Sequence, residues 1–277
     1  RVAVYMGDDQ RFDYLYKFVS NGRWNPNDRS ANFGLLDDGV LFVARFREDG
    51  KVDWLPLVWG TGPLTPENGF ESQADVLIET RVAADLLGAT PMDRPEDVEN
   101  NPQTGRVYVM LTNNSRREEA NVANPRAANP HGHIIEIATG HDHAALESDW
   151  SILVQCGNPE NPEDQAVWGP ATTASGWFTD PDNCAIDNRG RLWVTTDGNS
   201  DVDTGRSDGV WAMETEGELR GSGMHFYSCP AGAEMCGPYF TPNDETLFLA
   251  VQHPADDGEE WTEFNQPSTF ENPSTRW

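Results

Sequence analysis

The chain has 277 residues, and its 46 acidic against 19 basic side chains give a formal net charge of -27. This balance excludes a nucleic-acid binder that works by neutralising phosphates, and it argues against docking on anionic lipid. No apolar run is long enough to span a membrane, and the 37% hydrophobic content excludes a disordered chain.

The basic residues are almost all arginines, since Lys17 and Lys51 are the only lysines. Excess carboxylate with few lysines is a composition suited to high salt, where counterions screen repulsion between like charges. An acidic protein from an ordinary source remains the alternative. In both cases most acidic side chains are solvated, so a carboxylate needs a positional argument before it is assigned as a ligand.

The first part of the chain has strand patterns followed by one helix. Residues 2–9 resemble the second strand of a four-stranded unit and residues 14–19 its third, while no strand precedes residue 1. A helix is expected next, with Ser72 at its N-cap, apolar residues at helical spacing over 76–87 and a stop at Gly88.

Three later segments share one order: an acidic residue, an apolar strand, a turn, and a second strand that ends in polar residues. They cover residues 94–114, 181–197 and 233–253, with outer strands expected at 133–137 and 209–214. Repeated four-stranded units are typical of a β-propeller. We therefore predict an all-β fold, a β-propeller with about two complete and two partial blades and a short inserted helix. The single domain would cover 1–277 and be incomplete at both ends, because 268–277 stop without an outer strand.

Glu96, Asp182 and Glu234 occupy one equivalent position in the three repeats, just before the innermost strand of each blade. Because innermost strands line the central channel, the three carboxylates are expected to converge at one channel mouth. Converging carboxylates repel one another, and a hard cation relieves the repulsion. The alternative is that these acids pair with arginines or backbone amides, or are merely solvated.

Arg94 lies two residues before Glu96, so alternation along an extended chain could direct both side chains to the same face. A guanidinium beside a metal is well suited to a phosphate or carboxylate oxygen. An ion pair with Asp93 or Glu96 is the other interpretation.

Several weaker signals stay open at this stage. The polar ends of the second strands, such as Asn113, Asp197 and His253, are expected on the rim opposite the acids. Residues 197–203 have alternating oxygen donors that partly resemble a calcium loop. The histidine pairs at 131/133 and 141/143 could bind zinc but fit surface or turn positions better, and a pairing of Cys229 with Cys236 is undecided.

The sequence resembles the PhoX-type alkaline phosphatases, a family of calcium- and iron-dependent propeller enzymes. The matching stretches are residues 5–9 with 14–18, 94–97 with 104–108, 181–183 with 193–198, and 237–242 with 250–254. The resemblance implies a six-bladed ring whose channel holds Ca²⁺ and Fe³⁺. It also implies that Arg94 contacts phosphate, that Glu96 and Glu234 are carboxylate ligands, and that Asp182 is a further ligand. Export in folded form, to the periplasm or the medium, is implied as well.

Two departures from the family accompany this resemblance. Family members are roughly twice as long, and their N-terminal blades, with several iron ligands including a cysteine, would have to come from a separate or removed piece. No cysteine of this chain is therefore assigned to iron. The implied function is hydrolysis of phosphate monoesters, with diesters left open. A calcium-dependent propeller lactonase or esterase, a non-catalytic scaffold and an inactive fragment are the alternatives.

Overall fold

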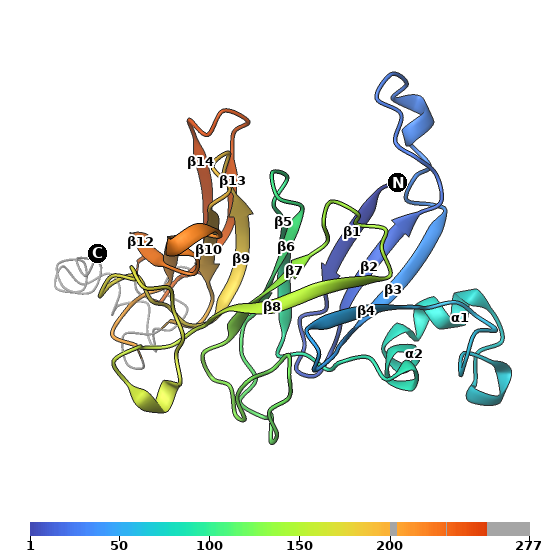
Figure 1. The fold of residues 1–277 in the computed structure, drawn as a ribbon, viewed down its shortest axis with the longest axis horizontal. Coiled ribbons are helices and arrows are strands. Elements are labelled where there is room, and N and C mark those ends of the chain that lie inside the picture. Colours follow the sequence, from blue (N-terminus) through green and yellow to red (C-terminus); the bar gives the residue numbers. More distant parts are fainter. Residues whose placement is uncertain (200–203, 231, 254–277) are drawn as a thin grey trace.

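The computed structural model describes residues 1–199, 204–230 and 232–253, and antiparallel strands are its main regular structure (Figure 1). Residues 200–203 of the calcium-loop-like stretch and the expected strandless end at 268–277 lie outside the described residues. The strands are β1 (Ala3–Gly7), β2 (Leu15–Ser20), β3 (Gly39–Phe46), β4 (Lys51–Pro56), β5 (Pro95–Asn100), β6 (Arg106–Leu111), β7 (His133–Ala138), β8 (Glu147–Gln155), β9 (Pro181–Ile186), β10 (Leu192–Thr196), β11 (Gly209–Met213), β12 (Gly223–Ser228), β13 (Glu234–Phe240) and β14 (Leu247–Gln252). Short 3-10 turns are found at Ser30–Asn32, Pro66–Asn68, Pro162–Asp164 and Gly217–Leu219.

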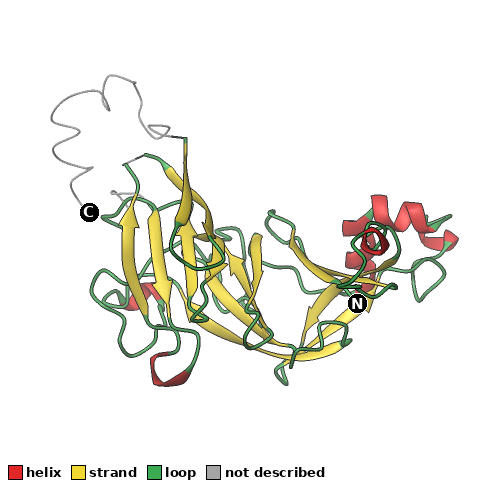
Figure 2. Ribbon diagram, turned by 90° about the horizontal axis from the view of Figure 1, so that it is seen from above, coloured by secondary structure: helices red, strands yellow, loops and turns green. Residues whose placement is uncertain are grey.

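The strands are grouped into successive antiparallel units that follow the chain. β1 to β4, β5 to β8 and β9 to β12 each form a four-stranded unit in sequence order, while β13 and β14 form a two-stranded sheet. The innermost strands β5, β9 and β13 contact their neighbours directly. Viewed from above, the units are arranged along an open arc (Figure 2). The predicted all-β, propeller-type fold is confirmed, and closure into six blades stays a prediction.

β1 is the edge strand of the first unit, and it contacts β5 of the second unit. Its last residue, Gly7, approaches Pro95 and Glu96 so closely that a Cβ at position 7 would overlap the Glu96 carbonyl oxygen. β6 also ends beside the start of β5, since Leu111 pairs with Pro95. Both strands therefore end where β5 begins. Because the first unit also has four strands, β1 to β4, the number of complete and partial blades stays a prediction.

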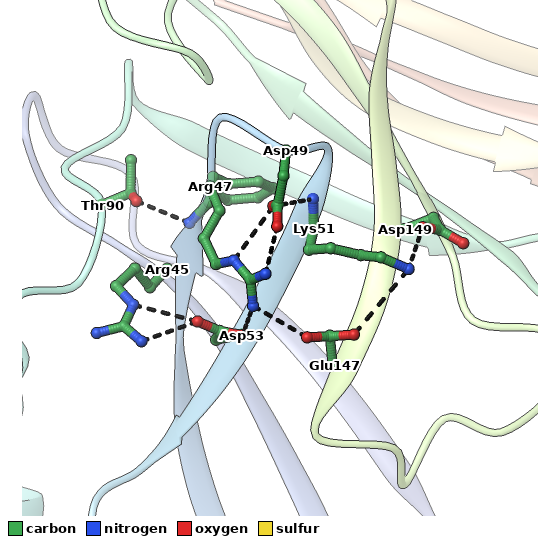
Figure 3. A network of polar contacts seen from close by, with 9 residues as sticks. Arg45, Arg47, Asp49, Lys51, Asp53, Thr90, Glu147 and Asp149 are labelled. Atoms are coloured by element: carbon green, nitrogen blue, oxygen red, sulfur yellow. Dashed lines mark hydrogen bonds and ion pairs between the residues drawn. The ribbon is translucent and has the colours of Figure 1, made fainter.

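The first two units are joined through their outer strands. β4 pairs with β8 over residues 51–53 and 147–149, which creates one eight-stranded sheet. Arg47 at this junction forms ion pairs with Asp49, Asp53 and Glu147 (Figure 3). Side chains that alternate along the strands fill apolar cores between successive units, with Trp54 and Ile135 in the first and Trp211 in the second.

The predicted helix is present but broken, so the prediction of one continuous helix is wrong. The structure has two short helices, α1 (Gln73–Ile78) and α2 (Thr80–Leu87), separated at Glu79, whose backbone leaves the helical region. The Thr80 hydroxyl donates to the Leu77 carbonyl, and such a bond competes with the regular helical ladder. The predicted ends of the helical segment are confirmed. Ser72 is the N-cap of α1, and Gly88 has a left-handed backbone directly after α2.

Several open questions from the sequence have answers in the fold. All four cysteines are free thiols, so Cys229 and Cys236 are not paired. His133 is fully buried, with its Nε2 2.8 Å from the Ala123 carbonyl, rather than on the surface. Within the described part of the chain, no helix has the length and apolar character needed to cross a membrane.

Candidate metal and phosphate site

The three predicted carboxylates lie at the beginnings of adjacent innermost strands. Glu96 is the second residue of β5, Asp182 the second of β9 and Glu234 the first of β13. Asp182 shares a hydrogen bond with Glu96, and its carboxylate also lies close to that of Glu234. The expected convergence of these side chains is therefore present in the structure, whereas their role as ligands stays a prediction.

The residue after each of the first two acids, Glu96 and Asp182, holds the next innermost strand in place. The Asp97 carboxylate accepts a hydrogen bond from the Cys184 amide at 2.9 Å, which ties β5 to β9. The Asn183 side-chain oxygen accepts one from the Gly237 amide, also at 2.9 Å, which ties β9 to β13. Because side chains alternate along a strand, these hydrogen bonds of Asp97 and Asn183 place Glu96 and Asp182 on the opposite face of their strands. There the two acids face each other.

The ends of the second strands belong to the same site, so the expectation that they lie on the opposite rim is wrong. The Asp197 amide donates to the Asp180 carbonyl at 3.1 Å, and Gln252, just before His253, pairs with Glu234. Likewise the Thr112 amide, just before Asn113, donates to the Arg94 carbonyl at 3.1 Å. The physical reason is the antiparallel hairpin, which places the end of the second strand beside the start of the first.

Three groups that the sequence did not assign join the cluster. Asp9 follows β1 and shares a hydrogen bond with Glu96. The charge of the nearby Asp197 raises the pKa of Asp182. The Cys236 thiol donates to Glu234 Oε1 at 2.8 Å, and its sulfur and one oxygen each of Asp182 and Glu234 all lie within 4.8 Å of one another. The recurrence of polar residues after each second strand was the available signal for Asp9 and Asp197. Cys236 had none.

Arg94 contacts the acids from the residue just before β5. Its Nε donates to Asp9 Oδ1 at 2.8 Å, and its Nη2 donates to Asp9 Oδ2 at 3.1 Å and to Glu96 Oε1 at 3.2 Å. Asp93 is not its partner, because Asp93 pairs with Arg117. The backbone of Arg94 is left-handed, with φ of 53°, an uncommon conformation for a residue other than glycine.

The electrostatics of the cluster show excess negative charge. Burial raises the pKa of Glu96 to about 9, helped by its hydrogen bond with Asp9 and the charge of Asp182. Burial, with the charge of Asp197, raises the pKa of Asp182 to about 7. The pKa of Asp197 is raised by burial and by the charge of Glu234. Several carboxylates thus face one another beside the Arg94 guanidinium, so an added cation would be favourable there.

This donor set fits a hard, multivalent cation. The cluster offers carboxylate oxygens from Asp9, Glu96, Asp182, Asp197 and Glu234, and oxygen donors are preferred by Ca²⁺ and other hard ions. Within the described residues, the group Asp182, Glu234 and Cys236 has ligand atoms close enough to hold one ion. Arg94 beside these oxygens can bind an anion such as phosphate through Nη1, which takes no part in its hydrogen bonds to Asp9 and Glu96.

Comparisons with known proteins identify the family of this chain. The family model described as alkaline phosphatase PhoX matches residues 1–255. The solved structure of Pseudomonas fluorescens PhoX in complex with vanadate, a transition state analogue, is 36% identical in sequence, with a TM-score of 0.85. The alignment covers 96% of this chain and 48% of that chain, so this chain spans about half the length of its relative. No curated protein matches the chain. With the family model matched over most of its length, the chain belongs to the PhoX alkaline phosphatase family.

Proposed function

We propose that this chain carries the phosphate-binding part of a metal-dependent phosphatase that hydrolyses phosphate monoesters. The observation that supports this most directly is Arg94, held by Asp9 and Glu96 at the edge of a carboxylate cluster in a PhoX family member. Vanadate bound to the related Pseudomonas fluorescens protein, where it is a transition state analogue, supports phosphoryl chemistry. These findings do not favour a lactonase, an esterase or a non-catalytic scaffold.

For the cations we propose Ca²⁺ and Fe³⁺, held by Glu96, Asp182 and Glu234. The support is the oxygen-rich donor set and the repulsion among these acids, which raises the pKa of Glu96 and Asp182. When bound, such ions polarise phosphoryl oxygens and lower the pKa of a nucleophilic oxygen. Asp9 and Asp197 add negative charge that favours binding of the cations.

The protein's own residues would bind and orient the substrate. Arg94 is fixed by two hydrogen bonds to Asp9, so its guanidinium is oriented before substrate arrives. It would share hydrogen bonds with the equatorial phosphoryl oxygens, where negative charge spreads in the transition state. Asp182 is almost fully buried, whereas Glu96 and Glu234 are half-buried, so the acids line a partly water-excluded site.

We further propose that additional blades, from another piece or a longer chain, complete the ring. The support is the 48% coverage of the related structure and an apolar groove of about 570 Å³ on the first unit. Val4, Met6 and Phe18 line this groove, and they alternate with residues such as Ala3 and Tyr5 that pack toward the second unit. Export to the periplasm or medium, and a single domain over 1–277, stay predictions.

Intact mass and elemental analysis of the purified protein test this proposal together with activity assays. We expect stoichiometric calcium and iron, and release of inorganic phosphate from a phosphomonoester but not acid release from a lactone panel. Phosphatase activity without any bound metal, or lactone hydrolysis alone, would contradict the proposal. Asp53→Asn, at the ion pairs between the first two units, is a control acid variant that should keep both metals.

A further inference from the structure

Arg11 differs from the other arginines of the described residues, because it is partly buried and its side chain forms neither a hydrogen bond nor an ion pair there. Other described arginines without such a partner, such as Arg23 and Arg116, are exposed. The Arg11 Nε is buried without a partner, whereas its two Nη atoms are neither buried nor hydrogen-bonded within the described part of the chain. Partial burial of an unpaired guanidinium costs free energy, so packing alone does not explain this side chain.

The backbone holds Arg11 beside the residue that precedes Arg94. Arg11 forms an isolated antiparallel β-bridge with Asp93, and the amide of the next residue, Phe12, donates to the Met92 carbonyl at 2.9 Å. Opposite residues in an antiparallel pair have Cα atoms about 4.5–5.5 Å apart and consecutive Cα atoms are about 3.8 Å apart, so the Cα atoms of Arg11 and Arg94 lie within about 9 Å. The combined length of two arginine side chains exceeds this separation.

Both arginines act on Asp9. Arg94 donates to Asp9 through Nε and Nη2, which leaves its Nη1 without a partner among the described residues. Although burial opposes it, the pKa of Asp9 is lowered by its hydrogen bonds with Arg94 and Glu96 and by the charges of Arg94 and Arg11. The Asp9 side chain is 43% exposed, so this edge of the candidate site is open to a ligand from solvent. Two guanidinium groups with free Nη atoms therefore lie near one accessible carboxylate.

The charge of phosphate esters gives a second guanidinium a distinct use. A phosphate monoester carries about two negative charges at neutral and alkaline pH, spread over unesterified oxygens. In a diester a second ester group replaces one of these oxygens and removes one charge. Because a guanidinium binds charged phosphoryl oxygens through charge-assisted hydrogen bonds, a second one favours the monoester.

We infer that Arg11 binds the same phosphoryl group as Arg94 and selects phosphate monoesters over diesters. The inference rests on the proposed phosphatase function and adds a substrate-selecting residue to it. Arg94 and the cations act on both classes of ester, whereas Arg11 contacts the oxygen that only a monoester leaves free. The bridge to Asp93 and the hydrogen bond of the Phe12 amide hold the backbone of Arg11 in place before substrate binds.

The test compares p-nitrophenyl phosphate with bis(p-nitrophenyl) phosphate in the metal-loaded protein, because the two esters share a leaving group and differ in the second ester bond. Arg11→Gln should lower kcat/KM for the monoester by about thirtyfold, the size of one hydrogen bond to a charged group, and change that for the diester by less than about twofold. The inhibition constant for inorganic phosphate should rise by a similar factor. Arg11→Lys keeps the charge without the planar fork and should recover part of the loss. Elemental analysis should find calcium and iron retained in both variants, since Arg11 offers no ligand atom for a cation.

Arg23→Gln is the matched control, because it removes the same charge from an exposed side chain that follows β2, at the end of β1 opposite to Asp9. It should leave the ratio between the two esters unchanged. Where hydrolysis of the diester is too slow to measure, its inhibition constant against the monoester replaces kcat/KM. If Arg11→Gln lowers both esters by the same factor, lowers neither, or loses the cations, Arg11 does not select monoesters. If the wild-type protein hydrolyses neither ester, the proposed function itself is wrong and the role of Arg11 falls with it.

Discussion

Arg94 and Asp9 lie 85 residues apart in the chain, yet their side chains form two hydrogen bonds, Nε to Oδ1 at 2.8 Å and Nη2 to Oδ2 at 3.1 Å. The contact bridges the end of β1 and the start of β5, which belong to different blades. These bonds fix the Nε and Nη2 atoms of the Arg94 guanidinium, and Nη2 also donates a hydrogen bond to Glu96 Oε1. The orientation of the Arg94 guanidinium, the proposed phosphate-binding group, therefore depends on a contact between two blades.

Replacement of Arg94 by alanine should remove most turnover and leave the cations bound. A preorganised donor that meets transition-state charge contributes about 10²–10³ in kcat, and Arg94 supplies no ligand atom for a cation. Steady-state kinetics and elemental analysis of Arg94→Ala measure both effects. Arg45→Ala, which removes an arginine paired with Asp53 at the surface, should keep wild-type kinetics. Unchanged turnover in Arg94→Ala would refute the role of this residue.

Asp9 should act on substrate through Arg94, which a double-mutant cycle can reveal. Asp9→Asn weakens the charge-assisted pair, so we expect kcat/KM to fall by about tenfold with calcium and iron retained. The double variant Asp9→Asn/Arg94→Ala should then be no slower than Arg94→Ala, within about twofold. Losses that multiply in the double variant would show that Asp9 works independently, and loss of metal would make it a ligand instead.

Cation affinity should rise with pH up to about pH 9. Without metal, the pKa of Glu96 is about 9 and that of Asp182 about 7, both raised first by burial, so these acids hold protons that a cation must displace. Titration of chelator-treated protein with Ca²⁺ between pH 6 and 10 measures this dependence. An affinity that is flat across this range, or that falls with pH, would contradict the assignment. Glu96→Gln should flatten the upper part of the curve.

The same pKa values predict how the metal-free protein responds to pH. An acid whose folded pKa is raised stabilises the fold below its unfolded pKa, near 4.5 for Glu96, and this stabilisation is lost as pH rises toward 9. Chelator-treated protein should therefore unfold more easily at pH 9 than at pH 6, and added Ca²⁺ should reverse the trend. Thermal unfolding at the two pH values, with and without the ion, checks both parts.

The buried ion pair beside the site should matter far more to stability than the exposed network between the first two units. Arg117 and Asp93 are almost fully buried, so Arg117→Ala leaves the Asp93 charge uncompensated and should cost about 3 kcal/mol or more. Arg47→Ala, in the exposed network of Figure 3, should change the denaturation midpoint little. Urea unfolding compares the two variants, and an equal loss in both would contradict the argument.

Much of the fold could be predicted from the sequence because each blade repeats the same local rules. Apolar and β-branched runs bounded by turn residues specify hairpins, and the repeat placed Glu96, Asp182 and Glu234 at equivalent positions. The helix was predicted with its correct ends, but the break at Glu79 was not, since helical spacing of apolar residues continues through it. Local pattern therefore determined which elements form and which acids head the innermost strands.

The tertiary structure alone decided what meets those acids. Asp9 and Asp197 follow second strands, and only the antiparallel pairing of each hairpin, with the contact of β1 against β5, brings them to the start of β5 and β9. Cys236 lies beside Glu234 because side chains two residues apart on a strand share a face, but only the contact of β13 with β9 brings the two to Asp182. Such contacts depend on the direction and spacing of strands from different blades, and a linear pattern of residue types carries neither quantity.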